Sequence, residues 1–279
     1  GTGVVGGGGR GLAGKVGLGA VGGGRVCAPA GWVAATDLRG SAGRSVPTTL
    51  LAMVDSAVGG KTGVNLARGK NRAGAVWQPR AVICDSDLLA SQDDRSFRSA
   101  FAEIIKSAMI VDTALVDDLD THLDGLLRRD PALLARVVRE SCAIKARIVS
   151  ADEREAGERA VLNYGHTAGH ALEAAAGFGD VLHGEAVAVG MRVAGRLSID
   201  ELRCPAGDIG WQDEMIERCG LPTTLVFDLE RVLGHMRADK KNVGDQLGWV
   251  LLERRGRPQT GRRVPEPAVR NALNSVLTQ

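Results

Sequence analysis

The sequence lacks an excess of charge of either sign. Its 35 Lys and Arg residues nearly balance 33 Asp and Glu residues, which leaves a formal net charge of +2. The two signs are interspersed along the chain, whereas nucleic acids and anionic membrane surfaces are bound by clustered positive charge. We therefore expect no nucleic acid and no membrane as a partner, and a small charged metabolite remains as the class of ligand.

Paired cysteines and long apolar runs are also missing. The five cysteines are odd in number and never form C-x-x-C, which argues against a disulfide framework and a thiolate zinc site. No stretch reaches the roughly 20 uninterrupted apolar residues of a membrane span, and the N-terminus has no compact apolar core of a signal peptide. We expect a cytoplasmic protein. The cysteines are Cys27, Cys84, Cys142, Cys204 and Cys219.

The pattern of apolar residues changes near residue 95. Residues 1–24 are dominated by glycine and bury little apolar surface, so part of this stretch is expected to be disordered. Short apolar runs between glycine-rich turns then favour a parallel α/β arrangement. From residue 96 the apolar residues recur at helical spacing almost to the end. We predict an α/β N-terminal domain, 1–95, followed by a mostly α-helical C-terminal domain, 96–279.

The densest group of reactive side chains is NYGHTAGHALEAAAGFGDVLHGEAVAVG. His166 and His170 are four residues apart and would share a helix face, and a glycine-rich turn could bring His183 back to them. Histidine nitrogens with one carboxylate suit zinc or a similar divalent ion. Glu103, in FAEIIKSAMI, lies either on a solvent stripe or against a cation or metal. The alternative for the histidines is a hydrogen bond to backbone at helix ends.

A glycine-rich segment, VDSAVGGKTGVNLARGKN, contains Asp55, Lys61, Lys70 and Asn71. Its glycines let the backbone approach a ligand, and such loops suit phosphate. The segment is not a P-loop, because Asp55 stands where that motif needs its first glycine. An ordinary surface turn with solvated lysines remains the alternative.

A third segment, IKARIVSADEREAGERAVLN, carries Lys145, Glu155, Arg159 and Asn163 at intervals. Most such runs are solvated charged faces. Their position next to the histidines makes a shared site the competing interpretation.

Taken in order, these stretches resemble the 3-dehydroquinate synthase family of sugar phosphate cyclases. The similarity runs from about residue 22 to residue 252, and it implies an incomplete α/β nucleotide-binding domain followed by a helical metal-binding domain. The stretches are PTTLLAMVDSAVGGKTGVN, GKN, AEIIK, IKARIV, DEREAGERAVLNYGHTAGHALE, LHGEAVAVGM and a late DKK.

The resemblance also implies a role for individual residues. It makes Glu103, His166 and His183 the ligands of Zn²⁺ or Co²⁺, and so assigns His170 to the substrate instead. The catalytic set that it implies is Asp55, Lys61, Lys106, Lys145, Glu155, Arg159, Asn163 and His170. Further substrate contacts are Arg39 from the partner in a homodimer, Asn71, and one of Lys240 and Lys241. The NAD contacts are Gly22, Gly23, Gly24, Thr48, Thr49, Asp55, Lys70, Asn71 and Ser91.

The implied reaction converts the seven-carbon sugar acid phosphate DAHP to 3-dehydroquinate. NAD oxidises the C5 hydroxyl, phosphate leaves, the ketone is reduced again, and an aldol step closes the ring. Alternatives are aminodehydroquinate synthase or another sugar phosphate cyclase, such as a 2-deoxy-scyllo-inosose or valiolone-type synthase. A metal-dependent alcohol or glycerol-phosphate dehydrogenase is more distant, and a non-catalytic paralogue is the alternative outside enzymes.

Departures from the family gather on the NAD side. Relatives have G-G-G-x-x-G-D where this chain has Cys27 and Ala28 in place of the last Gly and Asp, so a carboxylate is missing and Cys27 adopts a positive φ less readily. The adenosine-binding units expected before this loop are replaced by the glycine-rich stretch. SAGRSV is a poor strand, and residues 91–93 are Ser-Gln-Asp instead of T-L-P. We predict weak or absent NAD binding.

Overall fold

The computed structural model describes residues 4–6, 17–66, 69–111, 113–155, 157–177, 180–243 and 248–278; for residues 4–6, 38, 64–66, 69–72 and 239–243 it describes the backbone alone. The chain groups into two compact units, each made of two stretches of sequence. Unit 1 is Gly1–Phe97 with Asp124–Arg159, and unit 2 is Arg98–Leu123 with Ala160–Gln279. The domain ranges 1–95 and 96–279 stay a prediction, and each unit is described by itself.

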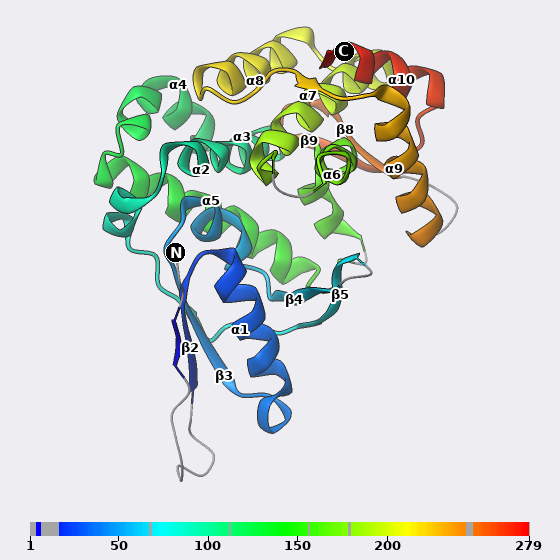
Figure 1. The fold of residues 1–279 in the computed structure, drawn as a ribbon. Helices are drawn as coiled ribbons and strands as arrows, with labels where there is room; N and C mark the ends of the chain where they lie inside the picture. Colours follow the sequence, from blue (N-terminus) through cyan, green and yellow to red (C-terminus); the bar gives the residue numbers. More distant parts are fainter. Residues whose placement is uncertain are drawn as a thin grey trace. The chain divides into compact units, whose positions relative to one another are not determined.

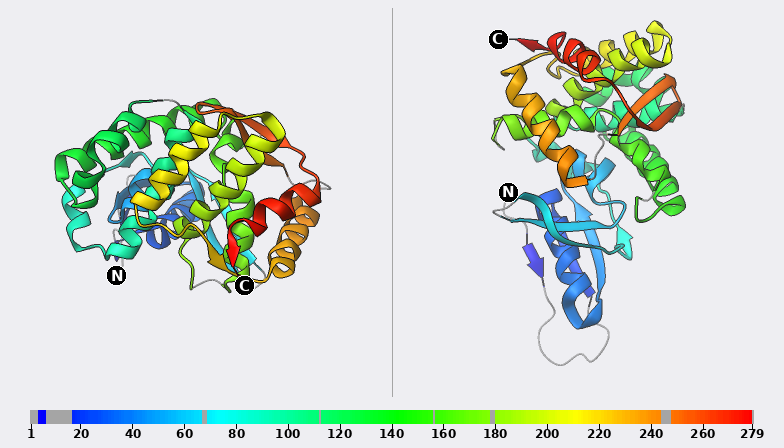
Figure 2. Two further views of the ribbon diagram at one scale, coloured as in Figure 1. Left: turned by 90° about the horizontal axis from the view of Figure 1, so that it is seen from above. Right: turned by 90° about the vertical axis from the view of Figure 1, so that its right-hand side faces the viewer.

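Unit 1 is built on a small sheet with the strand order β1-β2-β3-β6. β2 and β3 are parallel, as are β3 and β6, while β1 is antiparallel to β2. Helix α1 connects β2 to β3 and packs on both (Figures 1 and 2), so the α/β prediction for this region is confirmed. The bounds are β1 Val4–Gly6, β2 Gly17–Gly22, α1 Gly24–Thr36, β3 Ala42–Pro47 and β6 Ala81–Val82.

Three features of unit 1 differ from the sequence-based expectations. The glycine-rich N-terminus contains the strands β1 and β2, while residues 1–3 and 7–16 lie outside the described part. SAGRSV forms β3 in spite of its composition, because both neighbouring strands supply ladder hydrogen bonds to it. Cys27 lies inside α1 and has no positive φ, so the backbone penalty expected there does not arise.

The rest of unit 1 surrounds the glycine-rich segment. β4 and β5 form an antiparallel hairpin, and a π-helical turn, η2, presents Asp55 between β3 and β4. Such turns are rare and are frequent at functional sites. The long helix α5 packs on η2 and begins at Pro131, whose fixed φ suits the first position of a helix. The bounds are η2 Ala52–Ser56, β4 Lys61–Leu66, β5 Gly69–Val76, η3 Ser86–Ser91 and α5 Pro131–Ala151.

Unit 2 is mostly helical, as predicted. Its core lies around α7, against which α3, α6, α8 and α10 pack (Figure 1). No helix in the described residues is long and apolar enough to cross a membrane. The helices are α3 Phe101–Ile110, α4 Ala114–Leu127 (which continues into unit 1), α6 His166–Ala175, α7 His183–Leu202, α8 Ala206–Arg218, α9 Leu229–Val243 and α10 Glu266–Asn274; η4 spans Glu158–Asn163.

Unit 2 also contains strands that the helical pattern did not predict. β8 and β9 form an antiparallel hairpin beside α7, seen in orange and red in Figure 2. β7 pairs in parallel with β10. The bounds are β7 Leu225–Val226, β8 Trp249–Arg254, β9 Arg257–Arg262 and β10 Leu277–Thr278.

Candidate metal centre and anion-binding residues

Glu103 is the buried carboxylate of unit 2. Every residue of α3 is buried, and Glu103 is only 2% exposed. A carboxylate in such surroundings needs a compensating charge. Lys106, one helical turn later and equally buried, forms an ion pair with the Oε2 atom of Glu103. The Oε1 atom has no hydrogen-bond partner of its own among the described residues, so it stays available to a ligand.

His166 and His183 are the first residues of α6 and α7. The two helices approach closely where Gly165, with φ of 78°, precedes α6. A Cβ on Gly165 would lie 2.9 Å from the backbone nitrogen of Met191, so the approach needs glycine. Further along α6, Gly169 lies against the backbone of Ala186 and Val187 in the first turn of α7, so the close packing of the two helices brings His183 toward the α6 face that carries His166.

The three side chains converge on one point. The Nε2 atoms of His166 and His183 lie 3.5 and 3.3 Å from Oε1 of Glu103. One ligand atom from each residue lies within 4.8 Å of the others. Two imidazoles and a carboxylate are the ligand set of several catalytic zinc sites, which keep a further position open for a substrate oxygen. The triad named from the resemblance is therefore assembled in unit 2.

Charges around the triad keep Glu103 ionised. Burial opposes ionisation, but Lys106 and the two histidines outweigh it and hold the pKa of the Glu103 carboxyl well below its usual range. Burial, with Lys106 nearby, lowers the pKa of His166 to about 3. Burial acts in the same direction on His183, but the neighbouring carboxylates of Glu103 and Glu173 outweigh it and raise the pKa of His183 to about 10. The site thus presents an anionic carboxylate and a neutral His166, while His183 has to lose its proton before its Nε2 atom can bind a metal.

Glu173 is a functional candidate that sequence analysis missed. It lies on α6, is 7% exposed, and its Oε2 atom is 3.3 Å from Nδ1 of His183. A hydrogen bond at Nδ1 fixes the tautomer and leaves Nε2 for a metal. The sequence signal was its spacing of seven residues from His166, which puts both on one face of α6.

His170 lies next to the triad without belonging to it. Its ring centroid is 5.3 Å from that of His166 and 6.4 Å from that of His183, and it is exposed. The i, i+4 spacing therefore placed the two α6 histidines correctly side by side, while the closest set of ligand atoms takes His183 instead. Asn163, the last residue of η4, precedes α6 in the same unit.

Asp55 and Lys145 form the central ion pair of unit 1. The Nζ atom of Lys145 lies 2.5 Å from Oδ1 and 2.5 Å from the backbone oxygen of Asp55. Lys145 is largely buried on α5 and Asp55 lies on η2. The two contacts hold the π-helical turn against α5. They also place the anionic carboxylate of Asp55 next to the cationic amine of Lys145.

Two further charged residues hold the glycine-rich segment of unit 1. Lys61 pairs with Glu155, whose φ of 59° is uncommon for a residue other than glycine. Arg159 is 2% exposed, and its Nη2 donates to the backbone oxygen of Gly59 at 2.8 Å. Its Nε atom is buried without a hydrogen-bond partner among the described residues. Strained backbone and an unsatisfied buried donor are more frequent at ligand sites than elsewhere.

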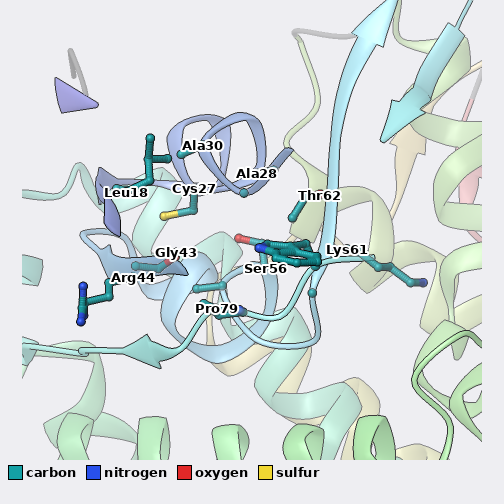
Figure 3. Close-up of a pocket in the computed structure, with 16 residues that line it drawn as sticks. Leu18, Cys27, Ala28, Ala30, Gly43, Arg44, Ser56, Lys61, Thr62 and Pro79 are labelled. Atoms are coloured by element: carbon teal, nitrogen blue, oxygen red, sulfur yellow. The ribbon is translucent and has the colours of Figure 1, made fainter. Parts of the chain in front are cut away.

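The Gly22–Gly24 loop lies at the carboxyl end of β2 and begins α1. Backbone N–H groups at such a position can cradle phosphates. Beside it is a pocket lined by residues from β2, α1, β3, η2 and β4, including Cys27, Ala28 and Ser56. Figure 3 shows the Cys27 sulfur directed into this pocket. Ser56 Oγ is buried there without a hydrogen-bond partner among the described residues, so the pocket lacks the acceptor that a carboxylate at position 28 would supply.

The remaining predicted residues are spread over the surface of unit 1 or are not described. Arg39 is exposed and has a φ of 67°. Ser91 is exposed and donates to the backbone oxygen of Leu88 at 3.2 Å. Thr48 donates its backbone N–H to Gly22 at 3.1 Å, and Thr49 packs beside Gly23. The side chains of Lys70, Asn71, Lys240 and Lys241 lie outside the described part of the structure.

Comparison with known proteins supports one class of enzyme. The family models for the N-terminal and C-terminal parts of 3-dehydroquinate synthase match residues 10–99 and 100–242. A 3-dehydroquinate synthase of Acidithiobacillus ferrooxidans is 47% identical over 261 residues, which are 92% of this chain and 71% of the relative. One of Halorhodospira halophila is 47% identical over 267 residues, 92% of this chain and 73% of the relative.

Solved structures share the fold. The 2-epi-5-epi-valiolone synthase ValA from Streptomyces hygroscopicus, with NAD⁺ and Zn²⁺ bound, aligns with a TM-score of 0.85 and 26% identity over 92% of this chain and 72% of ValA. A 2-deoxy-scyllo-inosose synthase in complex with carbaglucose-6-phosphate, NAD⁺ and Co²⁺ aligns with a TM-score of 0.82 and 28% identity. That alignment covers 93% of this chain and 74% of the synthase.

The fold is that of sugar phosphate cyclases. Within that class, the chain belongs to the 3-dehydroquinate synthase family, whose enzymes are phosphate-eliminating lyases of the shikimate pathway.

Proposed function

We propose that this chain converts DAHP to 3-dehydroquinate with a divalent cation, Zn²⁺ or Co²⁺, held by Glu103, His166 and His183. The observation that carries the proposal is the convergence of both Nε2 atoms on the Oε1 atom of Glu103. A cation there would supply Lewis-acid polarisation of a substrate oxygen. Lys106 balances the charge on Oε2, and Glu173 orients His183.

The donor set fits such a cation. Oxygen and imidazole nitrogen are borderline ligands that suit Zn²⁺ and Co²⁺. The Oε1 atom has no well-formed hydrogen bond of its own, and leaving a buried carboxylate oxygen in that state costs free energy unless a ligand takes it.

The charged residues of unit 1 fit the anionic parts of the substrate. Lys61, Lys145 and Arg159 would neutralise phosphate and carboxylate, and the buried Nε of Arg159 is a donor with no other described partner. Arg159 in particular favours a substrate with a carboxylate, because guanidinium pairs with carboxylate in bidentate geometry. Aminodehydroquinate synthase activity shares this feature and is the second candidate among enzymes.

NAD is the second cofactor of the proposal, with reduced affinity. Backbone N–H groups of the Gly22–Gly24 loop would hold its phosphates, and bound NAD would take up and return the hydride. Ala28 provides no carboxylate, and the Ser56 hydroxyl of the same pocket has no hydrogen-bond partner within the described part of the chain. The same observation favours a non-catalytic paralogue as the alternative outside enzymes.

Phosphate release tests the proposal. We expect release from DAHP with added Zn²⁺ and a high concentration of NAD, abolished in Glu103→Gln and retained in Glu217→Gln, which alters an exposed carboxylate of the same unit. A wild-type chain that binds zinc but releases no phosphate at any NAD concentration would instead support the paralogue.

Two further expectations concern the oligomeric state and the cellular compartment. We expect a homodimer, with Arg39 contributing to the partner's site, and sedimentation equilibrium would report its mass. The five cysteines are all free thiols, which supports a reducing, cytoplasmic compartment.

A further inference from the structure

Asp152 ends helix α5 and begins the loop that leads to Arg159. Its backbone N–H still donates to the Ile148 oxygen at 3.1 Å, as in a helix. Its φ of −147° and ψ of 84° then take the chain out of the helix. Asp side chains at such positions can accept hydrogen bonds from nearby backbone N–H groups. Asp152 belongs neither to the metal triad nor to the residues named from the resemblance, so the loop gives it a role of its own.

The carboxylate of Asp152 closes this loop. Its Oδ2 atom accepts from the backbone N–H of Gly157 at 2.8 Å and from that of Arg159 at 3.1 Å. Hydrogen bonds to a carboxylate are stronger than those to a neutral acceptor, so the two together fix the course of the backbone. Glu155, inside the loop, has a φ of 59°, which few residues other than glycine adopt. The loop is thus held in a curled form.

The curled loop holds Arg159 at both ends. Asp152 fixes its backbone, while its Nη1 atom donates to the backbone oxygen of Glu153 at 2.5 Å. Its Nη2 atom donates to the backbone oxygen of Gly59 at 2.8 Å. Arg159 is buried, and its Nε atom has no hydrogen-bond partner among the described residues. Because Glu153 belongs to the same loop, the form of the loop decides where the guanidinium lies.

We propose that Asp152 is a positioning residue for substrate recognition, which holds the Arg159 guanidinium in place to pair with the carboxylate of a sugar acid phosphate. This role presupposes the substrate class of the proposed function. A planar guanidinium binds a carboxylate through two parallel hydrogen bonds, so its placement matters more than that of a point charge. A displacement of about 1 Å in a positioning group can cost about 100-fold. Asp152 acts through Arg159 and does not itself contact the substrate.

Binding of DAHP to the zinc-loaded chain tests the role, in calorimetry without added NAD so that no turnover occurs. We expect the dissociation constant to rise about 10- to 100-fold in Asp152→Ala. It should stay near the wild-type value in Asp152→Asn, whose amide oxygen still accepts both N–H groups. Glu158→Ala, which removes an exposed carboxylate of the same loop, is the matched control and should also bind as wild type does.

Two further measurements separate this role from a general effect on folding. Zinc affinity should be unchanged in Asp152→Ala, because the triad lies in unit 2 and Asp152 in unit 1. Arg159→Gln should weaken DAHP binding by itself, and adding Asp152→Ala to it should weaken binding little further, since both changes remove the same contact. Circular dichroism checks the fold of each variant. If Asp152→Ala does not fold, Asp152→Ser, whose shorter side chain cannot reach both N–H groups, takes its place.

The role of Asp152 is refuted if Asp152→Ala binds DAHP as tightly as wild type. It is also refuted if Asp152→Asn loses as much affinity as Asp152→Ala, or if the losses from Asp152→Ala and Arg159→Gln add in full in the double variant. A wild-type chain that binds zinc but does not bind DAHP would instead overturn the proposed function, and the role of Asp152 with it.

Discussion

At the scale of single residues, the two oxygens of Glu103 have different tasks. Oε2 meets Lys106 and Oε1 faces both histidines, so the carboxylate stays ionised in a buried helix while one oxygen is left for a ligand. Glu173 extends the arrangement by holding the far side of His183. The proposed metal site would therefore depend on residues that do not themselves contact the ion.

Replacement of Glu173 by Gln tests that dependence. The neutral amide is a weaker acceptor for the His183 Nδ1–H, so zinc affinity should fall about 10- to 100-fold. Competition with a fluorescent zinc chelator measures the dissociation constant. Glu217→Gln is the control, and an unchanged affinity in Glu173→Gln would show that Glu173 does not support the site.

Gly59 should tolerate no side chain. Its φ is 106°, and a Cβ would lie 2.8 Å from Nη2 of Arg159. Gly59→Ala should lower the free energy of unfolding by about 1–3 kcal/mol, measured by urea denaturation. In Gly210→Ala, on an exposed helix face with open space around it, we expect a gain of about 0.5–1 kcal/mol. Equal effects at both positions would refute the role given to Gly59.

At the scale of elements, the helices around the site were predictable because their signals are local. Pro131 after Asp130 marks the beginning of α5, since Asp130 caps the helix by accepting from Ala132 and Leu133. The π-helical turn at Asp55 was not predictable, because it depends on the Lys145 contacts from a distant helix. The tendency of SAGRSV to form the strand β3 was underestimated for the same reason. The neighbouring strands stabilise a sequence that has little strand propensity of its own.

The N-cap of α2, Asp94–Ser99, gives a pH-dependent prediction. Oδ1 of Asp93 accepts from the Ser96 backbone N–H at 2.8 Å, and this bond lowers the pKa of Asp93. The stabilisation is thus present above the unfolded-state pKa of about 3.9 and is lost as the pH falls through the lowered folded-state value. Asp93→Ala should lower the free energy of unfolding by about 1 kcal/mol at neutral pH and by much less in acid.

Urea unfolding at neutral and acidic pH measures the Asp93 effect. Asp93→Asn is the control, because the amide oxygen still accepts the hydrogen bond but does not titrate. If Asp93→Ala lowered the free energy of unfolding equally at both pH values, the capping role would be contradicted.

At the scale of the whole molecule, the family could be predicted from the sequence because it depends on long motifs with characteristic spacing. The same motifs named Glu103, His166 and His183, which the structure brings together; their role as metal ligands stays a prediction. The prediction of His183 rather than His170 as a metal ligand came from the resemblance. Helical spacing alone favours His166 with His170, which lie on one face of α6. Glu173 escaped prediction, because its contact with His183 depends on how α6 and α7 pack.

NAD affinity tests the nucleotide-binding part of the molecule. We expect calorimetry to show weak or undetectable binding to wild type, and micromolar affinity would contradict that expectation. Ala28→Asp should strengthen binding, since it returns a carboxylate to the pocket next to the unsatisfied Ser56 hydroxyl. Ala206→Asp, at the first residue of α8 and exposed, is the control and should leave NAD binding unchanged.

Anomalous diffraction at the zinc edge, from crystals grown with Zn²⁺, tests the central claim most directly. The account predicts one strong peak in unit 2 within about 2.0–2.2 Å of an oxygen of Glu103 and the Nε2 atoms of His166 and His183. A peak bound by other residues, or no peak at these three side chains, would contradict it.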